Sequence, residues 1–181
     1  ALPIFLKKRG FLLLLFAPNY FIKRNQLRNL GFLIKLPIKP YGTIIIDLNK
    51  DIKYIQSSLK QKWRNTLKKG IKKTKISKIE NLEEVKHILE QYHLFAKQNN
   101  FIPIEKEKCL MWMSEKNQKI KLEIYKADDE NNDFIGAIGI LYFSYTSFYL
   151  FGFSNLSGRK LHANSALLWH SITESKSNKF E

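Results

Sequence analysis

The sequence is poor in cysteine: Cys109 stands alone among 181 residues, so an intramolecular disulfide is excluded. This scarcity favours a reducing, cytoplasmic setting. Long apolar runs are also missing, since no stretch approaches the about 20 residues of a membrane-spanning helix. The run Phe11–Phe16 follows basic residues as in a signal peptide, but it is too short and no convincing cleavage site follows. We expect Phe11–Ala17 to be a buried strand and Cys109 to be buried and unreactive.

Several catalytic motifs are absent. The histidines have no metal-ligand spacing with one another or with Cys109, so we expect no metal site. There is no P-loop and no dinucleotide-binding glycine motif. GFSNL at Gly152–Leu156 matches only the first half of a nucleophile elbow. No residue stands out as a general base, and we expect no bound cofactor.

Acidic residues are scarce as well. The chain has 31 lysines and arginines against 16 aspartates and glutamates, a formal net charge of +15. No acidic residue occurs between Ile52 and Ile79. Such a charge predicts attraction to polyanions, namely nucleic acid, phosphorylated metabolites or an anionic membrane surface. The hydrophobic content of 44% is nevertheless that of a globular protein with its own core.

A basic helix is predicted from Asp51 onward. Apolar residues recur there at every fourth position, which places them on one helical face: Ile55, Leu59, Trp63, Leu67 and Ile71. Asp47 or Asn49 is placed to cap its start, and Gly70 lies near its expected end. Basic residues form the adjacent stripe: Lys60, Arg64, Lys68 and Lys72, with Lys62, Lys69 and Lys73 beside it. The stripe is either a solvated face or a phosphate-binding surface.

Apolar runs and turn residues predict the other elements. Short strands are expected at Phe11–Ala17, Gly31–Leu36 and Thr43–Leu48, with a short helix between the first two. Downstream we expect a strand over 72–80, helices over 81–100 and 105–116, strands over 119–127, 133–143 and 147–153, and a helix over 161–177. Asn81 is placed to cap the 81–100 helix, with its apolar residues facing inward: Leu82, Val85, Ile88, Leu89, Tyr92 and Phe95.

This order of elements resembles the opening of the GNAT acyltransferase fold, which next adds another strand. The resemblance implies an α+β, GNAT-like (acyl-CoA N-acyltransferase) fold with a mixed central sheet flanked by helices. The additional strand would lie beyond Glu181, so we expect a fold truncated at its C-terminus. We assign 1–50 to the end of an upstream GNAT-like repeat, 51–70 to a basic connecting helix and 71–181 to a second, incomplete GNAT-like domain.

Two motifs make the resemblance more specific. KWRNTLKKGIKK, residues 62–73, has lysine-x-arginine, an apolar position and further lysines before a glycine and a strand. SFYLFGFSNLSGRKLHANSALLWHSI, residues 147–172, has a strand with tyrosine-x-x-glycine, a serine-containing basic loop and a leucine-leucine-tryptophan helix. Together with PYGTIIIDLNKD at 40–51, they resemble the FemAB/FemX-like family of peptidoglycan bridge-forming aminoacyltransferases, over about residues 31–178. Gly70 or Lys69 replaces an alanine that is usual in the family.

The resemblance implies transfer of an amino acid from aminoacyl-tRNA to an amine of a nucleotide- or lipid-linked peptidoglycan precursor. Both substrates carry phosphates. The candidate phosphate-binding residues are Lys62, Arg64, Lys68, Lys69, Arg159 and Lys160, and the candidates for lining the acceptor groove are Tyr149 and Ser154. Arg64 is the strongest, because a guanidinium binds two phosphate oxygens at once. Arg159 and Lys160 are expected in a loop before a helix, where backbone N–H groups favour anions.

Other functions stay open. One alternative is an acyl-CoA-dependent N-acyltransferase of the same fold that acts on a sugar or polysaccharide intermediate. The pyrophosphate loop of ordinary GNAT enzymes, arginine/glutamine-x-x-glycine-x-glycine/alanine, is not found, which weighs against that enzyme. Another is a noncatalytic nucleic-acid-binding module. The expected location is the cytoplasm, either free or peripheral at the anionic inner face of the membrane.

Overall fold

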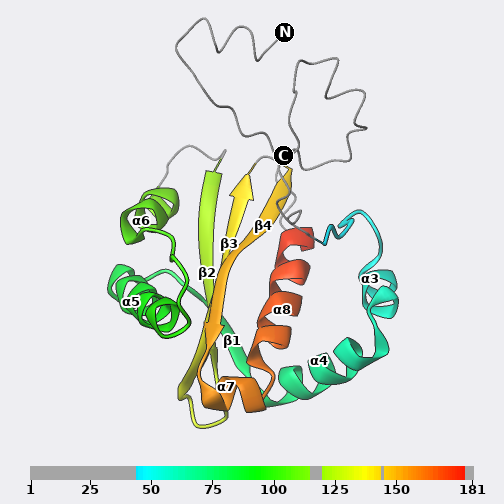
Figure 1. Cartoon of the computed structure of the whole chain (residues 1–181). Helices are drawn as coiled ribbons and strands as arrows, with labels where there is room; N and C mark the ends of the chain where they lie inside the picture. Colours follow the sequence, from blue (N-terminus) through cyan, green and yellow to red (C-terminus); the bar gives the residue numbers. More distant parts are fainter. Residues whose placement is uncertain (1–43, 115–119, 144, 178–181) are drawn as a thin grey trace, which may run out of the picture. The chain divides into compact units, whose positions relative to one another are not determined.

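The computed structural model describes residues 44–114, 120–143 and 145–177. Apart from Ile44, these belong to one compact unit, Ile45–Glu181. Within the described residues, four strands form one sheet in the order β1-β2-β3-β4, with helices on both faces (Figure 1). The predicted α+β class is therefore confirmed. The expected strands Phe11–Ala17 and Gly31–Leu36, and the helix between them, lie outside the described residues.

The elements follow one another in the expected order. They are α3 (Ile52–Ser58), α4 (Gln61–Lys73), β1 (Lys75–Ile79), α5 (Leu82–Gln98), α6 (Lys106–Ser114), β2 (Ile120–Asp128), β3 (Phe134–Phe143), β4 (Thr146–Ser154), α7 (Leu156–Lys160) and α8 (Ala163–Ser177). From β1 onward this is the predicted strand, two helices, three strands and helix. The short helix α7 was not predicted.

The described sheet is antiparallel throughout. β1 pairs with β2 from Lys75 opposite Asp128 to Ile79 opposite Ile124, across the whole of α5 and α6. β2, β3 and β4 form a meander of two consecutive hairpins. The acidic tip of the first hairpin is a turn, as expected, in which Asp129 Oδ1 accepts hydrogen bonds from two backbone amides. β1 and β4 are consequently the edge strands of the described sheet.

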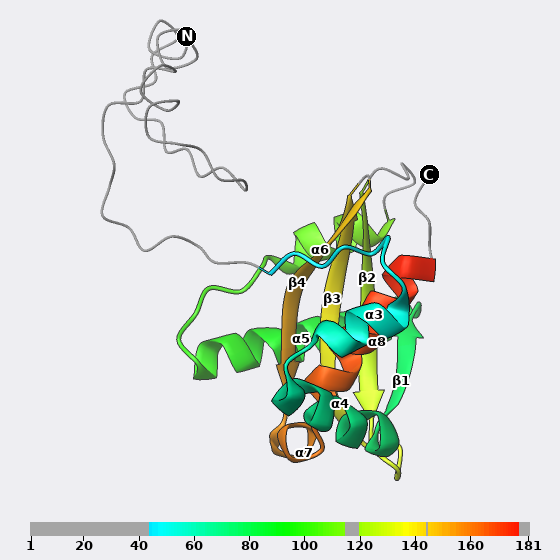
Figure 2. The same cartoon turned by 90° about the vertical axis from the view of Figure 1, so that its right-hand side faces the viewer.

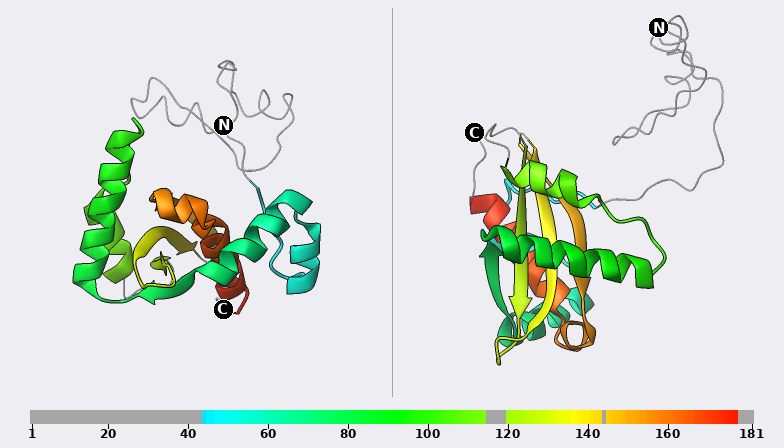
Figure 3. Two further views of the ribbon diagram at one scale, coloured as in Figure 1. Left: turned by 90° about the horizontal axis from the view of Figure 1, so that it is seen from below. Right: turned by 90° about the vertical axis from the view of Figure 1, so that its left-hand side faces the viewer.

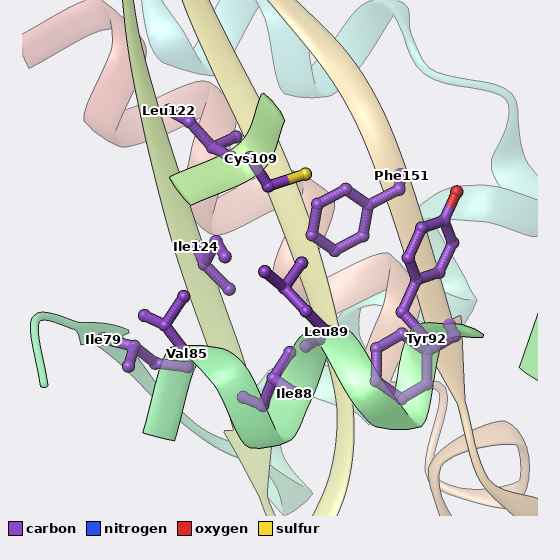
Figure 4. Close-up of a cluster of buried hydrophobic side chains, with 11 residues drawn as sticks. Ile79, Val85, Ile88, Leu89, Tyr92, Cys109, Leu122, Ile124 and Phe151 are labelled. Carbon is purple, nitrogen blue, oxygen red and sulfur yellow. The ribbon is translucent and has the colours of Figure 1, made fainter. Parts of the chain in front are cut away.

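One face of the sheet packs against α5 and α6 (Figure 3). The cluster contains Ile79, Val85, Ile88, Leu89, Tyr92, Cys109, Leu122, Ile124, Ala137, Phe151 and Phe153 (Figure 4). Asn81 caps α5 as predicted, since its Oδ1 accepts from the backbone N–H groups of Glu83 and Glu84. Leu82 was expected to face inward but is 54% exposed. It is the first residue of α5, one turn before the buried stripe begins at Val85.

The other face packs against α8 (Figure 2). Its core consists of Tyr125, Ala127, Ile135, Ile138, Ile140, Tyr142, Ala163 and Leu167. Alternate residues of β2 thus enter opposite clusters, as the two-residue period of a strand requires. Because both faces are covered by helices, a polar side chain in the middle strands must find a partner inside the protein.

The predicted single basic helix is in fact two helices. Leu59 and Lys60 have extended backbones, with ψ of 144° and 142°, and separate α3 from α4. The cap of α3 is Asp51, whose side chain accepts from Lys53 N at 2.7 Å, in place of Asp47 or Asn49. The every-fourth-residue spacing continues across the break, which is why the sequence predicted one helix.

Two neighbouring expectations are also corrected. The described part of the predicted strand Thr43–Leu48 is irregular and ends in a turn at Leu48. At the other end, α4 continues past Gly70 to Lys73. Of the predicted inward residues, Ile55 and Leu67 are buried, whereas Ile71 is 48% exposed. The buried side of α4 is therefore short, and its glycine, Gly70, takes part in the contact with α8 in place of a long apolar stripe.

Candidate anion-binding site

The outward side of α4 carries only polar and basic side chains. Leu67 and Gly70 are buried on the inner side. At about 100° per residue, the opposite arc holds five exposed lysines, which we call the lysine face: Lys62, Lys68, Lys69, Lys72 and Lys73. No described carboxylate lies within 4 Å of any of their ammonium groups. Three of the predicted phosphate-binding residues therefore share one solvent-facing surface.

Arg64, the strongest predicted phosphate ligand, points elsewhere. Its Nη1 donates to the carbonyl oxygen of Ser57 at 2.7 Å and to that of Leu59, and its Nη2 donates to Gln61 Oε1. The last carbonyls of a helix have no partner within the helix and carry negative partial charge. Arg64 satisfies those of α3, so it links α3 to α4. This position favours a structural role for a side chain that the sequence suggested as a phosphate clamp.

Gly70 sets the close approach between α4 and the junction of α7 with α8. A Cβ atom at Gly70 would lie 2.7 Å from the carbonyl oxygen of His162 and 3.3 Å from Ala166 Cβ. A side chain at this position would require one of the two segments to shift, so the contact depends on the glycine. α4 and α7 both lie at the end of the sheet where β4 ends (Figures 1 and 2). The contact thereby places two basic segments at one end of the molecule.

The segment after β4 is a short helix and not the expected loop. Asn155 Oδ1 accepts from Gly158 N at 2.8 Å, and its Nδ2 donates to the Phe134 carbonyl at 2.9 Å. This side chain therefore occupies the first turn of α7. Arg159 and Lys160 are exposed in its last turn. They add positive charge beside α4, but not at the N–H groups that the sequence suggested.

Ser154 is buried at the end of β4. It is 5% exposed and lies against Gly136 and Gly158, where added Cβ atoms would come within 3.0 Å of Ser154 Cβ. The backbone N–H of Asn155 donates to the Ile135 carbonyl at 3.1 Å, which fixes the same turn. This environment favours a packing role for Ser154 over contact with an acceptor.

Tyr149 is 53% exposed on β4, and its hydroxyl end lies against Gly152. The strand is irregular here, since the pairing register with β3 shifts between Gly139 and Ile140. Tyr149 and Ser154 are five positions apart along β4, or about 16 Å. The two expected acceptor-groove residues therefore do not form one cluster, and Tyr149 is the accessible one.

A buried carboxylate was missed by the sequence analysis. Glu123 is 3% exposed in β2. Its Oε1 lies 2.7 Å from Lys78 Nζ and 2.8 Å from Lys121 Nζ, and its Oε2 accepts from the Tyr125 hydroxyl at 2.6 Å. The Tyr125 and Tyr142 hydroxyls are 3.4 Å apart. This polar cluster connects the edge strand β1 to the centre of the sheet.

The electrostatics of this cluster hold Glu123 ionised. Burial alone would raise the pKa of its carboxyl, but hydrogen bonds from Lys121, Lys78 and Tyr125 lower that pKa to about 2. Burial, with the bond to Glu123, raises the pKa of Tyr125. The only sequence signal was one acidic residue in the alternating run KLEIYK, and no local pattern shows that helices cover both faces.

Other candidate features are weak. Burial and nearby Glu107 raise the pKa of the fully buried Cys109 thiol to about 11, as expected of an unreactive residue. Within the described ranges, no group of three or more histidine, cysteine, aspartate or glutamate residues is placed to hold a metal ion. No helix in the described part of the chain is long and apolar enough to cross a membrane.

A hollow lies on the far side of the sheet from α4. It has a volume of about 460 Å³ and is lined by Glu90, His93, Leu94, Lys97 and Lys106 of α5 and α6. Glu90 and Lys106 approach each other within it, at 3.8 Å. It brings together none of the predicted site residues.

Comparison with known proteins supports the fold. No protein-family model matches the sequence, and no curated protein matches it significantly. The structure is similar to the crystal structure of FemX, with a TM-score of 0.62 and 10% sequence identity, over 72% of this chain and 48% of that one. The chain thus spans about half the length of FemX. The expected FemX-like, GNAT-like fold is confirmed.

Proposed function

We propose, taking the FemX-like fold as the premise, that the protein is an aminoacyltransferase that moves an amino acid from aminoacyl-tRNA to an amine of a peptidoglycan precursor. The observation that carries the proposal is a coincidence of two independent signals. The motifs at 62–73 and 147–172 resemble the FemAB/FemX-like family, and the same residues build the α4 and β4–α7–α8 segments of a FemX-like fold.

The proposed reaction needs few catalytic side chains. The acceptor amine attacks the ester carbonyl of the aminoacyl-tRNA, a C–N bond forms and the bond from the carbonyl carbon to the ribose oxygen breaks. The proton lost by the amine ends on the released ribose hydroxyl. Most of the acceleration comes from positioning the two substrates and stabilising the oxyanion. The described residues contribute one part of this machinery, a basic end of the molecule that attracts phosphate-bearing substrates.

Individual roles follow from accessibility. The lysine face with Arg159 and Lys160 is assigned to substrate phosphates, because these cations are exposed. Tyr149 is assigned to the acceptor side, because it is half-exposed on the edge strand β4. The proposed setting is the cytoplasm, where charged tRNA is made, with the inner membrane face as the site of any lipid-linked acceptor.

A transfer assay on the natural full-length protein tests the proposal. One reaction receives tRNA charged with a radiolabelled amino acid and a parallel reaction receives labelled acetyl-CoA, each with a pool of peptidoglycan precursors. Label that moves from tRNA to a precursor supports the proposed function. Label that moves only from acetyl-CoA overturns it in favour of an acyl-CoA N-acyltransferase. RNA binding without transfer from either donor would favour a noncatalytic nucleic-acid-binding module.

A further inference from the structure

The lysine face is unfavourable for the isolated protein. Lys68 and Lys72, and likewise Lys69 and Lys73, are four positions apart on one helix, and Lys69 and Lys72 are three apart. Like charges at these spacings are neighbours on the helix surface, and each such pair destabilises the helix. A helix that only needed to be soluble could intersperse acidic residues among its lysines, as α5 does with Glu83, Glu84 and Glu90.

The lysine face differs from the other described lysines in gathering unpaired charges on one helix. The other lysines without a carboxylate within 4 Å are spread over several elements: Lys53, Lys60, Lys75, Lys97, Lys160 and Lys176. The lysines with carboxylates within 4 Å are Lys50, Lys78, Lys86, Lys106, Lys108, Lys121 and Lys126. These include Lys86 on α5 and Lys108 on α6, which are exposed like the lysines on α4. Across the described residues, the lysine face has no such neighbour. Its charge is left for a partner outside the chain.

The lysine face is also held on a rigid support. Leu67 is fully buried, and the close approach of Gly70 to His162 fixes the helix against α8. Arg64 fixes the start of α4 to the end of α3 through hydrogen bonds to Ser57 and Leu59. The backbone from which the lysines project is therefore ordered before any partner arrives, so little of the ordering cost falls on binding.

We propose that the lysine face binds the sugar-phosphate backbone of RNA and is the docking surface for the body of the donor tRNA, an inference that rests on the proposed aminoacyl transfer. Lysine ammonium groups act as point charges and do not impose the planar geometry of an arginine fork. Contacts of this kind position a nucleic acid without reading its bases. The face therefore recognises RNA by charge, and the aminoacyl end is selected elsewhere.

The chemistry of α4 fits RNA better than a membrane. An interfacial helix inserts its apolar side between lipids, but the apolar side of α4 is occupied by α8. Ile71, at 48% exposure, is the apolar side chain that borders the lysine face. Because a single weak signal gives only marginal, reversible adsorption, a basic patch without an inserted chain is a poor membrane anchor. A polynucleotide needs no apolar insertion.

The test compares two triple variants of the full-length protein. Lys68→Gln/Lys69→Gln/Lys72→Gln removes three charges from the lysine face. Lys86→Gln/Lys97→Gln/Lys108→Gln removes the same number from α5 and α6, on the opposite side of the sheet. Each is titrated with fluorescently labelled uncharged tRNA between 50 and 300 mM KCl, and circular dichroism checks that both fold.

The α4 variant is expected to bind tRNA at least tenfold more weakly at 100 mM KCl. The slope of log K against log salt should fall in magnitude by about 2–3, since each neutralised phosphate contributes about 0.7–0.9. The α5/α6 variant should stay within twofold of wild type. Equal losses in both variants would show a diffuse charge effect and overturn the inference. If α4 unfolds, Lys62→Gln/Lys73→Gln provides a milder variant with a smaller expected slope change.

Two further arms separate the inference from the proposed function. In one arm, vesicles of 70:30 phosphatidylcholine to phosphatidylglycerol replace tRNA. If the lysine face is needed for binding to these vesicles but not for binding to tRNA, the inference is overturned in favour of a membrane. The other arm measures transfer. A raised KM for aminoacyl-tRNA at unchanged kcat in the α4 variant supports the inference. An unchanged KM overturns the inference and leaves the proposed function standing. RNA binding that depends on α4, without any transfer, supports the RNA-binding surface and overturns the proposed function.

Discussion

Two charged side chains, Glu123 and Arg64, have their partners within the protein, Glu123 in the buried interior and Arg64 at the partly exposed junction of α3 and α4, and neither use is visible in the sequence. Glu123 is ionised inside the sheet, where Lys78, Lys121 and Tyr125 supply all the partners that water would have supplied. Arg64 donates hydrogen bonds to the carbonyl oxygens at the end of α3 and to Gln61. A residue type indicates what a side chain can bind, whereas its position in the fold decides what it does bind.

Glu123→Gln tests the buried carboxylate through its pH dependence. The pKa of Glu123 is about 2 in the folded protein, against an ordinary value of 4.5. A depressed folded pKa contributes stability that is present above 4.5 and is lost as the pH falls toward 2. This amounts to about 3 kcal/mol. Urea unfolding followed by tryptophan fluorescence should show wild type about 3 kcal/mol more stable than the variant at pH 7, a gap that closes between pH 4.5 and 2.

The matched control is Glu130→Gln, which makes the same charge change at an exposed position of the hairpin tip. Its unfolding free energy should differ from wild type by less than about 0.5 kcal/mol. A gap between wild type and Glu123→Gln that stayed constant from pH 7 to 2 would show that the depressed pKa is not what stabilises this cluster.

Arg64→Ala is expected to loosen α3. Hydrogen bonds to charged groups contribute about 1.5–3 kcal/mol when buried and less when partly exposed, as here. Hydrogen exchange of residues 52–60 should therefore accelerate severalfold, while exchange in α5 stays unchanged. Lys68→Ala, an exposed neighbour on α4, should leave both segments unaffected. If Arg64→Ala instead weakened phosphate or tRNA binding without any change in α3, the role first suggested by the sequence would be the correct one.

At the scale of elements, the β4–α7–α8 segment contacts α4 at a glycine residue. Gly70 meets a backbone oxygen of His162, and a Cβ atom at Gly158 would overlap the carbonyl oxygen of Ile135. His162 itself has a positive φ of 61°. The basic end of the molecule is therefore built by backbone-to-backbone contact, which depends on the absence of side chains at a few positions.

Gly70→Ala is expected to destabilise the protein even though alanine is the better helix former by about 1 kcal/mol. Overpacking against a fixed backbone atom costs about 1–3 kcal/mol, so after the gain in helix propensity we expect a net loss of up to about 2 kcal/mol in the free energy of unfolding. Lys69→Ala, at the neighbouring exposed position, should change stability by less than 0.5 kcal/mol. A Gly70→Ala protein as stable as wild type would mean that α4 can shift away from α8 at no cost.

How much the sequence predicted differs from element to element. α5 and the strands β1 to β4 were predicted because their apolar periodicity and the Asn81 cap are local signals. The break at Leu59–Lys60 was missed because the apolar spacing carries straight across it. α7 was missed because its sequence, LSGRK, is polar and contains a glycine, both typical of loops.

The candidate site was predicted in the same uneven way. Lys62, Lys68 and Lys69 are exposed as expected, since a run of lysines has few ways to be buried. Burial of Ser154 and the hydrogen bonds of Arg64 to the end of α3 depend on partners that are adjacent only after folding. The roles of these residues in binding stay predictions until they are tested.

At the scale of the whole molecule, positive charge is the dominant feature. The net charge of +15 makes self-repulsion a cost of compaction, and exposed charges are screened by salt. Raising KCl from 20 to 300 mM should therefore increase Tm by a few degrees. Lys68→Gln/Lys69→Gln/Lys72→Gln should show a smaller increase, because part of the repulsion has been removed.

Ion pairs act in the opposite direction. Lys126 lies 2.6 Å from Glu84 and joins β2 to α5, and salt weakens such a pair. A Tm that falls with added KCl would show that attractive pairs outweigh the repulsion along α4. The stability cost assigned to the lysine face would then be wrong.

The pairing of β1 with β2 has a consequence for how the chain folds. The meander β2–β4 closes through short hairpin loops, whereas Ile79 reaches Ile124 only after α5 and α6 have been spanned. Closing a longer loop costs more chain entropy, and contacts distant in sequence tend to form later. We expect the meander to nucleate folding and β1 to join last. Since α4 leads directly into β1, the most basic part of the chain is then also the last to be incorporated, and a polyanion can meet it while the sheet is still assembling.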